Sequence, residues 1–160
     1  MKTPARNLED NYSKIIEWSG KLSEEAFNIL QKGGGAVVGP TKVGYIFMVT
    51  DKAGLERKFD AKERKRNKPG VVLCGSLEQL RELAETSPEV EAFYQRHWDQ
   101  DILLGCILPW KKEAKAKYIP DDGSTELMMD QRNTSCFVIK FGIPSEQIVQ
   151  ALWASDMKLV

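Results

Sequence analysis

A dense group of basic side chains stands between Lys62 and Lys68, where five basic residues accompany a single acid. The chain as a whole is neutral, with 23 Lys and Arg residues against 23 Asp and Glu residues. Lys and Arg donate directional hydrogen bonds to phosphate and carboxylate oxygens, and Pro69-Gly70 can turn the backbone toward a ligand. The group therefore predicts an anion-binding site. The alternative is a solvated loop, because runs of charge usually face water.

Residues for other kinds of chemistry are few. The segment 33–42, GGGAVVGPTK, lacks the Gly-Lys-Ser/Thr ending of a phosphate-binding P-loop. His97, the single histidine, could act as a general base, but its aromatic neighbours near a predicted helix end favour packing or capping. The three cysteines have no zinc spacing, so buried free thiols are expected. We assign no catalytic nucleophile and no metal ligand.

The composition predicts one globular domain. Apolar residues make up 42% and charged residues 29% of a 160-residue chain, which suits a real core. No apolar run is long enough to cross a bilayer, and the first residues lack the apolar stretch of a secretion signal. We predict a cytoplasmic protein without a membrane partner. Zero net charge argues against a general nucleic-acid coat but is compatible with a local basic patch.

Helices and strands alternate along the first half of the chain. Residues 1–22 are expected to form an arm or a helix, ahead of a single domain over 23–160. A helix capped by Ser23 ends at the glycines 33–35. The patterns then predict strands over 36–40 and 44–50, the second of them buried, a helix over 52–64 and a strand over 70–75.

The second half continues the alternation. We predict three helices, over 76–84, 87–98 and 144–154, with Ser76, Ser87 and Ser145 as their caps, and strands over 101–110, 134–142 and 157–160. Segment 111–118 is interpreted as an edge strand or a flexible lid, and 119–133 as a mobile loop. Within that loop, Asp121 and Asp122 could meet Mg²⁺, but an Asp-Asp-Gly turn is the simpler account. The order favours an α/β (α+β) fold with an open, twisted, mixed sheet flanked by helices.

Several short motifs follow one another in a specific order. GGGAVVGPT, with Gly34-Gly35 and Pro40-Thr41, precedes a strand and a helix, and Lys62-Glu63-Arg64 and Pro69-Gly70 come next. From about Ala26 to Val160 this order resembles the YrdC-type threonylcarbamoyl-AMP synthase family. The resemblance implies a single YrdC-like domain with a basic concave face.

The resemblance also implies a reaction. The family condenses L-threonine, bicarbonate and ATP, with Mg²⁺, into threonylcarbamoyl-adenylate and pyrophosphate, a nucleotidyltransferase reaction that supplies the N6-threonylcarbamoyl modification of adenosine 37 in tRNA. Fixed positive charge suits this chemistry, because negative charge builds on phosphorus and on the leaving pyrophosphate. The residues implied are Lys62, Arg64, Asn67 and Lys68 for ATP, and Thr41, Lys42 and Lys140 for the substrate. Pro40 is expected to leave the Thr41 hydroxyl free for a substrate amine or carboxylate.

The chain departs from the family pattern at several places. Lys42 stands where an acid is common, Ile46 where Gly is common, and Lys140 where the family has Arg. Residues 99–103, DQDIL, replace a Pro-Gly-Pro-x-Thr motif. A Ser-x-Asn motif normally follows the strand that MKLV resembles, and the sequence ends at Val160, before it. We therefore expect these 160 residues to bind ATP weakly and to make little threonylcarbamoyl-adenylate by themselves.

Three functional hypotheses stay open at this point. The first is a synthase of this family. The second is a non-catalytic relative that binds nucleotide or RNA on the basic face, since the family has been linked with double-stranded RNA. The third is related carbamoyl-adenylate chemistry, as in hydrogenase maturation carbamoyltransferases. The fold by itself cannot decide among them.

Overall fold

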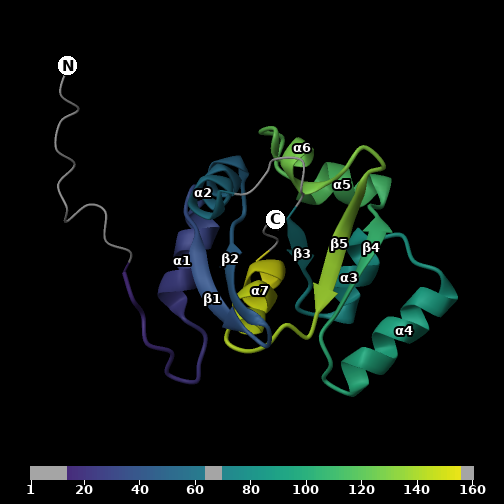
Figure 1. Cartoon of the computed structure of the whole chain (residues 1–160), viewed down its shortest axis with the longest axis horizontal. Coiled ribbons are helices and arrows are strands. Elements are labelled where there is room, and N and C mark those ends of the chain that lie inside the picture. Colours follow the sequence, from purple (N-terminus) through teal and green to yellow (C-terminus); the bar gives the residue numbers. More distant parts are fainter. Residues whose placement is uncertain (1–13, 64–69, 156–160) are drawn as a thin grey trace.

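The strands form two small sheets in the computed structural model, which describes residues 14–63 and 70–155 (Figure 1). Strands β1 (Val37–Thr41) and β2 (Gly44–Met48) pair as an antiparallel hairpin. The second sheet has the order β3-β5-β4, with β3 (Val71–Leu73) parallel and β4 (Leu104–Pro109) antiparallel to β5 (Thr134–Ile139). An open mixed sheet within an α/β arrangement is therefore confirmed.

Seven helices accompany these strands in the described ranges. They are α1 (Glu24–Lys32), α2 (Lys52–Lys62), α3 (Leu77–Leu83), α4 (Pro88–Asp99), α5 (Lys112–Tyr118), α6 (Ser124–Met128) and α7 (Ser145–Ala154). The caps Ser23, Ser76 and Ser87 are confirmed, because each side chain accepts the backbone N–H three residues later. Over the same ranges, no helix is long and apolar enough to cross a membrane.

The predicted cap Ser145 is wrong. Pro144 occupies the cap position, and Ser145 is the first helical residue. Its hydroxyl donates instead to the Pro40 carbonyl oxygen at 2.8 Å. Ser145 is fully buried between α7 and the hairpin, so tertiary packing directs the hydroxyl to β1 and the local capping preference is overridden.

Three other predictions need correction. Segment 111–118 is neither an edge strand nor a lid, because it contains α5, whose Ala114 and Tyr118 are buried. The expected loop 119–133 contains α6. Strand β2 is not buried along its length, since only Met48 is. The predicted strand 157–160 lies outside the described residues, as does most of the predicted N-terminal arm.

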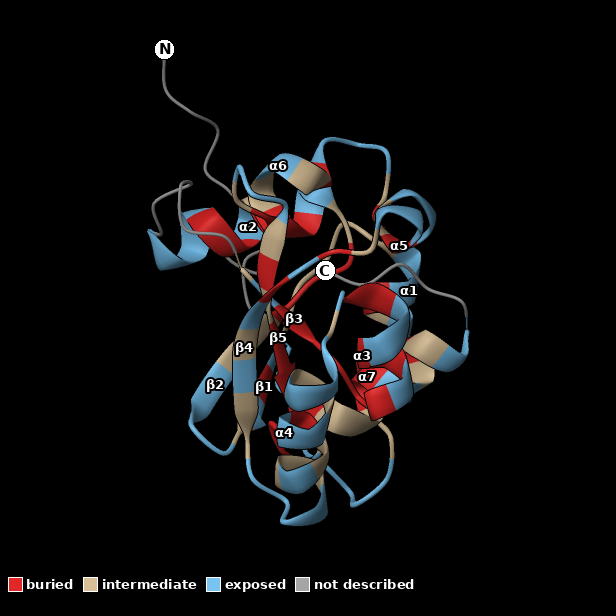
Figure 2. Ribbon diagram, turned by 90° about the vertical axis from the view of Figure 1, so that its right-hand side faces the viewer, coloured by how far each residue is buried: buried red, intermediate tan, exposed pale blue. Residues whose placement is uncertain are grey.

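Two hydrophobic clusters hold the domain together. In one, α3 and α4 pack on the three-stranded sheet around Phe137 and Tyr94. The Tyr94 hydroxyl donates to the Phe137 carbonyl at 2.7 Å and accepts the Cys106 N–H at 3.1 Å, which ties α4 to both β5 and β4. In the other, α1 and α7 pack on the hairpin and on the adjoining part of the sheet. Figure 2 shows α1, α3 and α7 on one side of the strands and α2 at the upper left, on the other side.

Candidate functional site

The side of the strands opposite α1, α3 and α7 forms the candidate site, called here the open face. On the sheet its residues are Val71, Ile107 and Cys136, because Cys136 pairs with Val71 on β3 and with Ile107 on β4. Ile107 is 64% exposed. Val71 and Ile107 thus place apolar surface on this side of the sheet, and Cys136 between them is partly covered.

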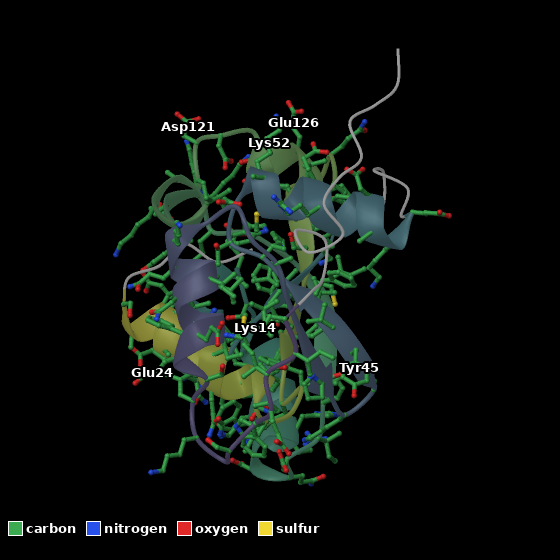
Figure 3. The ribbon with its side chains drawn as sticks, turned by 90° about the vertical axis from the view of Figure 1, so that its left-hand side faces the viewer. Lys14, Glu24, Tyr45, Lys52, Asp121 and Glu126 are labelled. Carbon is green, nitrogen blue, oxygen red and sulfur yellow. The ribbon has the colours of Figure 1, made fainter. Side chains whose placement is uncertain are left out.

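The hairpin contributes a second part of the open face. Val38 pairs with Phe47, and Tyr45 lies two residues from Phe47, so the three side chains share one side of the hairpin. Tyr45 is 76% exposed. In Figure 3 it projects from the hairpin on the side away from α7. The other side of the hairpin is closed by α7, where a Cβ at Gly39 would lie 2.6 Å from the Ser145 hydroxyl.

Lys62 lies beside the hairpin part of the open face. It is the last residue of α2, and its ammonium lies 5.8 Å from the centroid of the Phe47 ring. Glu63 ends the helix in a left-handed conformation, with φ of 48° and its N–H bonded to Phe59 and Asp60 carbonyls. The other residues expected to contact ATP, Arg64, Asn67 and Lys68, lie outside the described residues, so the structure locates only Lys62 among them.

Thr41 differs from the prediction. Its hydroxyl donates to the Gly44 carbonyl at 2.6 Å and accepts the Val43 N–H at 3.2 Å. The hydroxyl is therefore engaged within the turn that joins β1 to β2, which was the alternative account of this residue. The expectation of a free hydroxyl is wrong, and the substrate-binding role of Thr41 stays a prediction.

Lys42 and Lys140 meet at a shared acid, Asp101, and the three residues are called here the Asp101 cluster. The Lys42 ammonium lies 2.6 Å from the Asp101 carbonyl oxygen and 2.9 Å from its Oδ1. The Lys140 ammonium lies 3.7 Å from the same Oδ1. Lys140 also lies over the Trp98 ring, 4.0 Å from its centroid, a geometry typical of a cation–π contact.

Backbone geometry explains why these side chains converge. Asp101 and Lys140 both adopt left-handed conformations, with φ of 54° and 53°, at the turns before β4 and after β5. The Lys42 N–H donates to the Phe141 carbonyl at 2.8 Å, which holds the hairpin tip against the second turn. Gly142 allows this approach, because a Cβ there would lie 3.3 Å from the Lys42 nitrogen.

Electrostatics stabilise the ionised form of Asp101. The hydrogen bond from Lys42 lowers the pKa of the Asp101 carboxyl below its ordinary value, and the charge of Lys140 adds to this effect. The carboxylate is 71% exposed, whereas the Lys140 side chain is only 19% exposed. In the Asp101 cluster the two lysine side chains are thus partly buried, whereas the carboxylate faces solvent.

Other candidate residues have structural partners. His97 Nδ1 lies 2.8 Å from the Phe93 carbonyl and the ring packs edge-on against Phe93, as the packing interpretation predicted. Cys74 is a buried free thiol, as expected, while Cys106 and Cys136 are partly covered. Asp122 accepts the Ser124 N–H within its turn and the Lys52 N–H at the start of α2. Within residues 14–63 and 70–155, no group of His, Cys, Asp and Glu could hold a metal ion.

A family comparison identifies this architecture. The Sua5/YciO/YrdC family model, which carries the description "Telomere recombination", matches residues 28–136, more than half of the chain. The chain belongs to this family. The matched region includes the hairpin, Lys62 and the Asp101 cluster apart from Lys140. None of the curated proteins matches the sequence.

Solved structures agree with the family assignment. The chain is 59% identical to the hypothetical protein smu.1377c from Streptococcus mutans UA159, with a TM-score of 0.87, over 93% of this chain and 59% of that one. E. coli YciO gives 22% identity and a TM-score of 0.61, over 84% and 59%. P. abyssi Sua5 complexed with L-threonine gives 21% and 0.57, over 84% and 36%. The last two likenesses concern the fold alone. The chain spans about three fifths of the length of the first two proteins.

Proposed function

We propose that the open face binds ATP and L-threonine, and that the domain serves the synthesis of threonylcarbamoyl-adenylate from ATP, bicarbonate and L-threonine. That product would supply the N6-threonylcarbamoyl modification of adenosine 37 in tRNA. The observation that carries the proposal is the family match over residues 28–136, which contains the open-face strands β1 to β4 and Lys62.

The chemistry of the open face is compatible with these ligands. The apolar surface of Val71 and Ile107 suits the uncharged rings of a nucleoside, which gain by leaving water. Lys62 beside the hairpin supplies a positive charge for phosphate oxygens, and the sequence places more basic residues directly after it. Mg²⁺ would arrive bound to the ATP phosphates, because the described residues provide no dedicated carboxylate cage.

Lys62 offers a direct test of the ATP part. Replacing Lys62 by Met is expected to weaken binding of Mg²⁺-ATP by about 1.5–3 kcal/mol, the scale of a hydrogen bond to a charged group. The matched control is Lys112→Met, at the exposed start of α5 and away from the open face. Isothermal titration of both variants and the wild type measures the effect. Equal affinity in all of them would refute an ATP site at Lys62.

Turnover tests the reaction itself. Pyrophosphate release is measured with ATP and bicarbonate across a panel of amino acids, and a signal that requires L-threonine supports the proposed synthesis. Release with carbamoyl phosphate and no amino acid would favour related carbamoyl-adenylate chemistry instead. ATP binding without any release would identify a nucleotide-binding relative, and salt-sensitive RNA binding without ATP binding would favour an RNA partner.

A further inference from the structure

Three charged residues that are distant in the sequence come together in space. Lys42 follows β1, Asp101 precedes β4 and Lys140 follows β5. They are far apart in sequence, since 59 residues separate Lys42 from Asp101. Their side chains nevertheless contact one another in the Asp101 cluster. The fold therefore gathers these three charges at one place.

The cluster carries more positive than negative charge. A single carboxylate lies between two ammonium groups, at 2.9 Å from Lys42 and 3.7 Å from Lys140. Lys42 lies at the hairpin tip and Lys140 just after β5, where the Lys42 N–H donates to the Phe141 carbonyl. The Lys140 ammonium also contacts the Trp98 ring. This cation–π contact keeps the ammonium in position when the acid moves away.

The acid is the most exposed member of the cluster. Its side chain is 71% exposed, against 34% for Lys42 and 19% for Lys140. Exposed ion pairs contribute little net free energy, because water solvates the separated charges well. The Asp101 carboxylate can therefore leave at low cost, while the two lysines stay in place.

We infer that Lys42 and Lys140 form a binding site for a small anionic group, a carboxylate or a phosphate, and that Asp101 is an internal competitor for it. The inference rests on the proposed function only in assigning the anion to a substrate of the open face. Asp101 is then a residue that determines specificity, since an anion must carry enough charge, or contact both ammonium groups well enough, to displace it.

The test compares two acids at the same helix end. Inorganic phosphate and acetate are titrated separately, at low ionic strength, into the wild-type chain, Asp101→Asn and Asp99→Asn. Asp99 is the matched control, because it is exposed, changes the net charge equally, and is bonded to Gln95 rather than to a lysine. Side-chain NMR signals of Lys42 and Lys140 report binding at the cluster.

We expect Asp101→Asn to bind at least one of the two anions about tenfold more tightly than the wild type, because a like charge next to the site has been removed. Asp99→Asn should stay within about twofold. Adding Lys140→Met to Asp101→Asn should abolish the gain. The anion with the larger gain gives the chemistry of the group. Equal affinities in wild type and Asp101→Asn, or the same gain in Asp99→Asn, would overturn the inference.

The two proposals can fail separately. The titrations with phosphate and acetate need neither ATP nor threonine, so a gain in Asp101→Asn stands even where pyrophosphate release is not found. Conversely, threonine-dependent release together with an unchanged phosphate and acetate affinity in Asp101→Asn would support the reaction and reject the role of Asp101. Denaturant unfolding of each variant verifies that the fold is intact.

Discussion

Lysines near the open face occur in two contrasting settings. Lys42 and Lys140 share the carboxylate of Asp101, and Lys140 is held over the Trp98 ring at 4.0 Å. Lys62 is exposed at the end of α2, and its ammonium lies 5.8 Å from the centroid of the Phe47 ring. Lysine side chains are thus preorganised in the Asp101 cluster, whereas the Lys62 side chain is adaptable.

The difference has a consequence for binding. A preorganised ammonium loses little conformational entropy when it meets an anion, but it must first give up its internal partner. An exposed ammonium such as that of Lys62 must instead be ordered by the ligand. We therefore expect the Asp101 cluster to select among anions, and Lys62 to contribute mainly attraction.

Replacing Gly39 by Val should disturb both settings at once and have the largest effect. A Cβ at this position would lie 2.6 Å from the Ser145 hydroxyl and 2.9 Å from Met48 Cε, so these side chains or the hairpin itself would have to shift. We expect a loss of roughly 1–3 kcal/mol in the free energy of unfolding, the usual cost of overpacking. Denaturant unfolding measures it, and NMR signals of Lys42 and Lys62 should both shift.

The control for this variant is Val38→Thr, one residue away on the exposed side of the hairpin. A surface change of this kind is expected to stay within about 0.5 kcal/mol. If Gly39→Val were as stable as Val38→Thr, the packing of the hairpin on α7 would not position the lysines.

Tyr94→Phe should separate the two settings, with the next largest effect. Removing the hydroxyl leaves the Phe137 carbonyl and the Cys106 N–H without this buried partner, which should cost about 1–2 kcal/mol. Because Tyr94 ties α4 to the sheet, and α4 carries Trp98, the NMR signal of Lys140 should change while that of Lys62 does not.

The control is Tyr45→Phe, which removes the same hydroxyl from an exposed ring and should leave the free energy of unfolding unchanged. A loss of equal size in Tyr45→Phe would contradict this account.

Local signals explain which parts of the fold could be predicted from sequence. Ser23, Ser76 and Ser87 cap their helices because a cap depends on a few adjacent residues. The prediction that Ser145 caps α7 was wrong because its hydroxyl donates to a backbone carbonyl 105 residues away in the sequence. Helix α5 had a usable signal that was missed, since Ala, Lys and Glu are good helix formers and Ala114 and Tyr118 have helical spacing on its buried side.

The candidate site was predictable in part for the same reason. Lys42 and Lys140 could be proposed from short motifs, but no local pattern indicated Asp101 as their common partner. The contact depends on the left-handed turns at Asp101 and Lys140, which residues other than Gly rarely adopt. Such positions follow from the packing of the whole domain and not from the spacing of residues.

Trp98→Leu should sharpen the comparison with a smaller effect. Leucine keeps apolar contact with the core but removes the aromatic ring next to the Lys140 ammonium. We therefore expect the free energy of unfolding to fall by about 0.5–1 kcal/mol. The matched change is Phe47→Leu, which removes the ring near Lys62 at the longer distance of 5.8 Å. Side-chain NMR of the lysines should show a larger shift for Lys140 in the first variant than for Lys62 in the second. Equal shifts would mean that the two ammonium groups are held alike.

The pKa of Asp101 should give the smallest but most local readout. Its pKa is lowered, chiefly by the hydrogen bond from Lys42 and further by the charge of Lys140. A lowered carboxyl pKa means that the ion pairs stabilise the fold above the unfolded-state pKa, and that this contribution is lost as the pH falls through the lower folded-state value. Lys42→Met should therefore raise the pKa of Asp101 toward its ordinary value of about 3.9, and Lys140→Met should raise it less. Lys62→Met, outside the cluster, should leave it unchanged. An NMR titration of the Asp101 carboxyl carbon measures all three, and an equal rise in Lys62→Met would show that net charge, rather than contact within the cluster, controls this acid.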